Sequence, residues 1–233
     1  MDARRVVVGV DGRRGGWAVA VVEGTPERAA LRGWETFTAQ DAAPLVALAR
    51  AHGAAAVGID VPVGLPRADW RPADLLAKRA LGRAHPRVFL VPPREVLTAH
   101  DYAAARTRCR AVLHGKGLSA QTWGLRGPVL AVDALLAADP WARGHVVETH
   151  PELSFAALAG QVLASKKTAA GRAARIAALA RWLDPDQASE DAPGEDHLDA
   201  AACAYSALRW AAGGAVVLGG DEDERGLPMR VVT

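Results

Sequence analysis

The sequence contains little cysteine and no long apolar run, and each of these absences excludes certain classes of protein. Cys109 and Cys203 lie far apart, with no C-x-x-C pair and no matching histidine spacing, which argues against a disulfide framework or a structural zinc site. No window approaches about 18 uninterrupted apolar residues, so no membrane-spanning helix is expected. Residues 1–5, three of which are charged, run directly into a short strand-like segment, unlike a signal peptide. We therefore expect a cytoplasmic protein that does not bind membranes.

Composition indicates a globular chain whose charges are unevenly distributed. Half of the 233 residues are apolar, 23% are charged and the net charge is only +2. Residues 67–110 carry ten Lys or Arg against four Asp or Glu, whereas residues 184–199 hold seven acids and no Lys or Arg, and residues 221–224 are all acidic. The basic segment could dock a polyanion such as DNA or RNA, but an ordinary solvated helix face explains it equally well.

The order of apolar patterns along the chain indicates an α/β fold. We expect a strand hairpin at 6–10 and 17–22, further strands at 31–37, 55–60 and 144–149, and an edge strand at 216–218. We expect helices at 41–52, 72–82, 94–114, 128–138, 151–160, 171–183 and 197–212. This is the order of a ribonuclease-H-like fold, with a mixed five-stranded sheet flanked by helices. The length favours a single domain over residues 1–233 with a mainly helical basic insertion at about 67–144.

Carboxylates stand where strands end and where a helix begins. Asp11 ends the first strand and Asp60 the fourth, while Asp196 and Asp199 share one face at the start of a helix. Clustered acids repel one another unless a cation neutralises them, and ligands that are all oxygen select Mg²⁺ or Mn²⁺. Two such ions could activate water and stabilise the leaving oxygen in phosphodiester hydrolysis.

Each acid also has an ordinary structural explanation. Asp11 can begin a hairpin turn, Asp60 can cap the turn that follows it, and Asp196 can be a helix N-cap. The combination of two strand ends with one helix start favours the metal site over these separate roles.

Motifs over nearly the whole chain resemble the family of domain of unknown function 429. They lie at Gly9–Trp17, Gly58–Pro66, Glu148–Phe155, Ser165–Thr168 with Gly171, and Asp196–Ala200. The resemblance implies a predicted nuclease of ribonuclease-H-like fold. It also implies that Asp11, Asp60, Asp196 and Asp199 are similar to the metal-binding acids of the Holliday-junction-resolvase branch of that superfamily. The second acid there is commonly Glu, so the shorter Asp60 leaves Glu148, also at a strand end, as a longer alternative ligand.

Two adjacent lysines make up half of all lysine in the chain. Lys166 and Lys167 are compact point charges that could bind substrate phosphate, could balance the clustered acids, or could be solvated surface residues. We favour contact with phosphate, because lysines just before a helix that starts near Gly171 reach outward easily. We also assign Arg13, in the loop of the first hairpin, to substrate binding.

These observations predict a metal-dependent nuclease that acts on DNA or RNA. Its catalytic residues would be Asp11, Asp60, Glu148 and Asp199, and its Mg²⁺ or Mn²⁺ ligands Asp11, Asp60, Asp196 and Asp199. One alternative is an enzyme of the actin-like or sugar-kinase type, which begins with a similar strand-Asp-Gly-x-x-Gly-Gly segment but needs a second phosphate hairpin. Another is a nucleic-acid-binding module of the same fold without catalysis. The sequence leaves the oligomeric state open.

Overall fold

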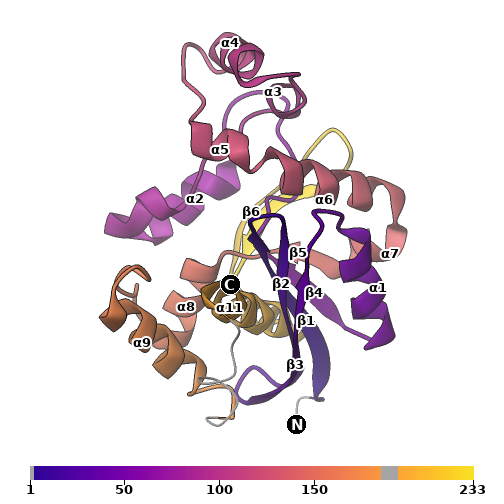
Figure 1. Ribbon diagram of the computed structural model, residues 1–233, viewed down its shortest axis with the longest axis vertical. Helices are drawn as coiled ribbons and strands as arrows, with labels where there is room; N and C mark the ends of the chain where they lie inside the picture. The colour runs from indigo at the N-terminus through magenta and orange to yellow at the C-terminus, as the bar shows by residue number, and fades with distance from the viewer. Residues whose placement is uncertain (1–2, 185–193) are drawn as a thin grey trace. The chain divides into compact units, whose positions relative to one another are not determined.

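The computed structural model describes residues 3–184 and 194–233, and the chain forms two compact units (Figure 1). The first unit comprises Met1–Val61, His145–Val216 and Val232–Thr233, and the second comprises Pro62–Gly144 and Val217–Val231. The insertion predicted at about 67–144 falls in the second unit, which also contains a C-terminal segment that the sequence pattern did not connect with it.

The first unit is built on a five-stranded sheet with the order β3-β2-β1-β4-β5. Strand β2 is antiparallel to both β1 and β3, whereas β4 is parallel to β1 and β5 is parallel to β4. This order and these directions confirm the predicted ribonuclease-H-like fold. The strands are β1 (Arg5–Arg13), β2 (Gly16–Gly24), β3 (Ala29–Phe37), β4 (Ala56–Ile59) and β5 (Val146–Glu148).

The β1–β2 hairpin starts the fold, as the sequence predicts. Its strands are rich in valine, whose branched side chains favour the pleated backbone, and most of their residues are buried. Arg13 pairs with Gly16, so the turn has two residues, and Gly15 adopts a left-handed backbone with φ of 80°. The Trp17 side chain is fully buried, and its indole N–H donates to the Asp41 carbonyl at 3.1 Å.

Helices cover both faces of the sheet in the first unit. Figure 1 shows α11 lying beside α8 and α9 on one side of the sheet and α1 on the other. The main apolar core lies between the sheet and the α8, α9 and α11 side, and it includes Val7, Ala20, Phe155, Leu179, Leu198 and Leu208. These helices are α1 (Ala43–Ala51), α8 (Pro151–Ala159), α9 (Ala169–Leu179) and α11 (Glu195–Ala211).

Helix α11 lies directly on the sheet because both partners are small at the contact. A Cβ atom on Gly9 of β1 would lie 1.9 Å from the Ala200 carbonyl oxygen, and one on Gly58 of β4 would lie 2.5 Å from the Cys203 carbonyl oxygen. Only glycine allows such an approach of backbone to backbone. The N-terminal end of α11 is also tied to β3, since His197 Nε2 lies 3.0 Å from Thr36 Oγ1.

The second unit is mainly helical. The helix predicted over 94–114 is in fact two helices, because Asp101 has an extended backbone and its carboxylate accepts the Ala104 N–H at 2.8 Å, which caps a new helix. The elements are α2 (Pro72–Ala80), the 3₁₀ helix η1 (Gly82–Arg87), α3 (Arg94–Leu97), α4 (Tyr102–Val112), α5 (Ala120–Gly124) and α6 (Arg126–Ala138), and α7 (Pro140–His145) then leads into β5.

The prediction of an edge strand at 216–218 is wrong about the sheet to which this strand belongs. Strand β6 (Val217–Glu222) does not join the five-stranded sheet but pairs with β7 (Pro228–Val232) in a separate two-stranded sheet. The reason is local: the turn that begins at Asp223 closes with hydrogen bonds from the Asp223 N–H to the Leu227 carbonyl and from the Gly226 N–H to the Asp223 carbonyl. The chain thereby returns on itself and provides β6 with a partner close in sequence.

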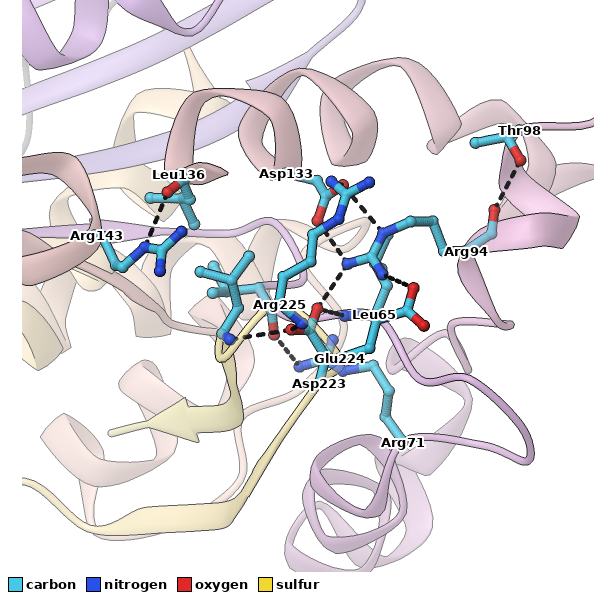
Figure 2. Close-up of polar contacts among 12 residues, drawn as sticks. Leu65, Arg71, Arg94, Thr98, Asp133, Leu136, Arg143, Asp223, Glu224 and Arg225 are labelled. Atoms are coloured by element: carbon cyan, nitrogen blue, oxygen red, sulfur yellow. Dashed lines mark hydrogen bonds and ion pairs between the residues drawn. The ribbon is translucent and has the colours of Figure 1, made fainter. Parts of the chain in front are cut away.

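A network of ion pairs holds this turn within the second unit (Figure 2). The Arg94 guanidinium lies 2.9 Å from Asp133 Oδ1, 2.6 Å from Asp223 Oδ2 and 2.8 Å from Glu224 Oε1. Arg225 also contacts Asp133, at 2.7 Å. Part of the basic segment 67–110 and part of the acidic run 221–224 therefore neutralise each other, and Arg94 is not available to a polyanion.

The cysteines and the apolar segments can also be compared with what the sequence predicts. Cys109 and Cys203 are both buried free thiols. Within the ranges 3–184 and 194–233, no helix has the length and apolar character required to span a bilayer.

The contact between α11 and the sheet predicts the effect of adding one methyl group. We expect Gly9→Ala to lower the free energy of unfolding by about 1–3 kcal/mol, because the new Cβ has no room beside Ala200. Gly33→Ala in β3 is the matched control, since a Cβ there meets no atom within 4 Å, and it should be neutral or slightly stabilising. Chemical denaturation of both variants measures the difference, and equal losses at the two positions would contradict the packing argument.

Candidate functional site

Three carboxylates from three elements of the first unit form the candidate site, here called the acid cluster: Asp11, Asp60 and Asp199. Asp11 lies in β1, Asp60 directly follows β4, and Asp199 lies in the N-terminal part of α11. Asp11 and Asp60 lie close enough for the charge of Asp60 to raise the pKa of Asp11, although burial is the larger cause. The sheet sets this pair, because Val10 and Ile59 are in register and the Asp60 N–H donates to the Val10 carbonyl at 2.9 Å.

The alternation of side chains in strands explains why the acids meet α11. Gly9 and Gly58 face α11, and residues two positions further along a strand point to the same face, which places Asp11 and Asp60 on the α11 side of the sheet. Asp199 directly precedes Ala200, the residue that packs on Gly9. The close contact of helix and sheet therefore brings the three acids together.

Lys166 provides the positive charge within this cluster. Its Nζ lies 2.5 Å from Asp199 Oδ2. Partial burial lowers the pKa of the Lys166 ammonium, but attraction to Asp199, with smaller contributions from Asp11 and Asp60, outweighs burial and raises the pKa above its ordinary value. Lys166 is therefore charged across the physiological pH range and partly balances the acids.

The loop that carries Lys166 is fixed at the N-terminus of α9. Thr168 caps the helix, since its Oγ1 accepts the Gly171 N–H at 3.0 Å and donates to the Ser165 carbonyl at 2.9 Å. A Cβ on Gly171 would lie 2.0 Å from the Ser165 carbonyl oxygen, so glycine is required there. The motif Ser165–Thr168 with Gly171 thus forms a tight turn that holds Lys166 in place.

Arg175 anchors the same loop from α9. The arginine is almost fully buried, and its Nη1 donates at 2.9 Å to the carbonyls of Ala164 and Gly171. Its Nη2 binds both carboxylate oxygens of Glu152, at 2.7 and 2.8 Å. Sequence reasoning missed Arg175, although the helical periodicity of the buried residues Gly171, Arg175, Ala178 and Leu179 places this arginine on the inward face of α9.

Burial and mutual repulsion raise the pKa values of the acids. Burial raises the pKa of Asp11 well above 3.8, and the charges of Asp60 and Asp199 raise it further. Burial also raises the pKa of Asp199, to about 6, in spite of the contact with Lys166. At neutral pH Asp199 is therefore mostly ionised and paired with the lysine.

Comparison with known protein families identifies the family of this chain. The sequence matches the family described as "Protein of unknown function (DUF429)" over residues 9–224. The chain belongs to this family. The match confirms the family membership that the motifs indicate. The matched range includes Lys166 and all members of the acid cluster.

The solved structures that are similar to this chain include two of RuvC. They are T. thermophilus RuvC in complex with a Holliday junction substrate and a structure of Thermus thermophilus RuvC, with 16% and 17% sequence identity. In each case the alignment covers 90% of this chain and 97% of the RuvC chain, with a TM-score of 0.47. Comparison with curated proteins finds no match.

Glu148 of this DUF429 protein does not lie with the acid cluster. It is in register with Ile59 of β4, which is itself in register with Val10 of β1. Residues in register share a face of the sheet, so Glu148 is on the face opposite Asp11 and Asp60. Glu148 is thus not placed to replace Asp60 as a ligand.

The remaining predicted residues surround the cluster. The Asp196 side chain is 42% exposed and its Oδ2 lies 3.9 Å from Arg13 Nε, so these two residues form a loose pair near the start of α11. Lys167 is exposed, unlike its neighbour Lys166. Of the two lysines, Lys166 is therefore the one paired with an acid, and Lys167 is the one exposed to solvent.

The acid cluster fits a hard divalent cation by its chemistry. All its donor atoms are carboxylate oxygens, which Mg²⁺ and Mn²⁺ prefer. Among the residues that the structure describes, no three His, Cys, Asp or Glu side chains are already arranged to hold a metal ion. Of these acids, Asp199 is already paired with the Lys166 ammonium group.

The electrostatics of the cluster predict that removing one acid stabilises the protein. Because the folded-state pKa of Asp11 is raised, its contribution to stability is present at low pH and is lost as the pH rises from about 4 through the raised pKa. Asp11→Asn cannot ionise, so at pH 7 it should be more stable than the wild type by about 0.5–2 kcal/mol. The advantage should shrink as the pH is lowered to 4.

Thermal unfolding from pH 4 to pH 8 measures this effect. Asp196→Asn is the control, because its partly exposed carboxylate lies outside the cluster and its replacement should give no comparable gain. If the wild type instead gained stability relative to Asp11→Asn as the pH rises, the predicted direction of the pH effect would be wrong.

Proposed function

We propose that this protein is a metal-dependent nuclease in which Asp11, Asp60 and Asp199 hold Mg²⁺ or Mn²⁺. The observation that carries the proposal is the convergence of three buried or partly buried carboxylates from β1, β4 and α11, with a single lysine paired to one of them. Grouping like charges in a buried place is unfavourable unless a cation is bound there. A divalent ion is the ligand that such a donor set would stabilise best.

Different residues would bind the metal ion and contact the substrate. A bound ion would supply activation of water and neutralisation of charge on the phosphate. Asp11, Asp60 and Asp199 would hold the ion, and Lys166 keeps the Asp199 carboxylate fixed beside the other two. The exposed Lys167 would contact the nucleic-acid backbone as a point charge, and the partly exposed Arg13 would do so from the end of β1.

The kinase-type alternative is less well supported by the described residues. It requires a second hairpin that binds phosphate through positive charge or backbone amides. The hairpin formed by β6 and β7 instead places Asp223 and Glu224 at its turn, where both contact Arg94. An acidic turn already occupied by an arginine is poorly suited to phosphate. A binding module without catalysis would not need the acid cluster.

The first functional prediction concerns the three acids. In a panel of single-stranded, duplex, hybrid and branched DNA and RNA, we expect cleavage that depends on Mg²⁺ or Mn²⁺. Asp11→Asn, Asp60→Asn and Asp199→Asn should each lower it by more than the roughly 10–100-fold typical of residues that only support a ligand. The amide keeps the shape of the side chain and removes the anionic ligand.

Two further variants serve as controls for this experiment. Asp69→Asn keeps full activity, because Asp69 is exposed in the second unit and its φ of 58° suits asparagine. Glu148→Gln should lose much less activity than the cluster variants, since Glu148 is on the opposite face of the sheet. Full cleavage by a folded Asp11→Asn protein would refute the nuclease proposal.

A second prediction separates binding from catalysis. Lys167→Ala should weaken nucleic-acid binding to a similar extent for all sequences and reduce the salt dependence of binding by about one unit of slope. Lys116→Ala, which removes another exposed lysine but from the second unit, is the matched control and should leave the slope unchanged. Fluorescence anisotropy at several salt concentrations gives both slopes, and identical slopes for the two variants would remove Lys167 from the substrate contact.

A further inference from the structure

Lys166 differs from an ordinary surface lysine in how it is held. The turn around it is closed by the Thr168 cap, by the close approach of Gly171 to the Ser165 carbonyl, and by Arg175 bound to the Ala164 carbonyl. Its side chain is 39% exposed, whereas that of Asp199 is 5% exposed. The side chain is therefore partly exposed to solvent while its ammonium group contacts Asp199, and it extends from a backbone that is fixed.

The charges of the cluster limit how many cations it can take. Fully ionised, the three carboxylates carry three negative charges, and Lys166 returns one positive charge. The remaining two negative charges match a single divalent ion. Two divalent ions together with the lysine would place five positive charges against three carboxylates, and the excess would repel each ion within the buried site.

The geometry also divides the ligands unequally. Asp11 and Asp60 are neighbours across β1 and β4, whereas one oxygen of Asp199 is occupied by Lys166 at 2.5 Å. The described contacts place no cation against the Asp11–Asp60 pair, whereas the Asp199 side already has one.

We propose that the Lys166 ammonium takes the place of a second divalent cation, so that the site holds one metal ion on the Asp11–Asp60 side and a fixed lysine on the Asp199 side. This inference rests on the proposed metal-dependent function. The expected site then contains one metal ion and the positive charge of Lys166 in place of two metal ions. The number of ions bound per chain can be measured without a cleavage assay.

The test is titration of the metal-free protein with Mn²⁺ in the absence of substrate, followed by calorimetry and by the electron paramagnetic resonance signal of free Mn²⁺. We expect one ion per wild-type chain, one for Lys166→Arg, which keeps the charge, and two for Lys166→Met. Lys167→Met removes the same charge from the exposed neighbouring residue and is the matched control, with one ion expected. Circular dichroism confirms that each variant is folded.

The outcomes distinguish this inference from the proposal on which it rests. Two ions per wild-type chain would overturn the role of Lys166 and leave the metal-dependent function intact. No ion bound to the folded wild type would overturn both. A folded Lys166→Met protein that still binds a single ion, at any affinity, would show that the lysine does not stand in for a cation. If Lys166→Met does not fold, the wild-type stoichiometry alone decides between one ion and two.

Discussion

The contact of helix α11 with the central strands is the constraint on which the rest of the first unit depends. Gly9 and Gly58 allow the helix backbone to reach the sheet, and small residues on the helix complete the contact. Since Asp11 and Asp60 lie two residues beyond these glycines, the same contact that closes the core also fixes where the acids meet. A larger residue at either glycine would therefore move Asp199 away from the strands as well as reduce stability. Packing and site geometry are consequences of one arrangement.

The second constraint is electrostatic. Three acids at the edge of a buried core carry a cost that apolar side chains of the same size would avoid. The protein offsets part of this cost with the ammonium group of Lys166, which is paired with Asp199. Arg175 and Glu152, themselves paired, fix the turn that brings the lysine there. So much supporting structure around a destabilising group is typical of a site that binds a ligand rather than of a fold that needs the charges.

The sequence predicts most of the first unit, because local signals are strong there. Valine-rich runs give β1 and β2, and Pro151 and the glycine after α8 bound that helix. Asp11 and Asp60 could be singled out because each comes directly after a run of apolar strand residues. The misplacement of Glu148 has a different origin, since its face depends on the register of β5 against β4, which no single strand reveals. The pairing of Lys166 with Asp199 likewise joins residues 33 positions apart through tertiary packing.

Charge along the chain is the least reliable guide to the second unit, for a physical reason. Composition counts every arginine of the segment 67–110 equally, yet Arg71 is fully buried beside Asp74, and Arg94 is enclosed by the acids of α6 and the β6–β7 turn. Such arginines stabilise the unit and contribute little to its outer field. The positive surface that remains includes the exposed arginines of α4, at 106, 108 and 110. The electrostatic field outside this unit therefore depends on its surface residues rather than on the total charge of the segment.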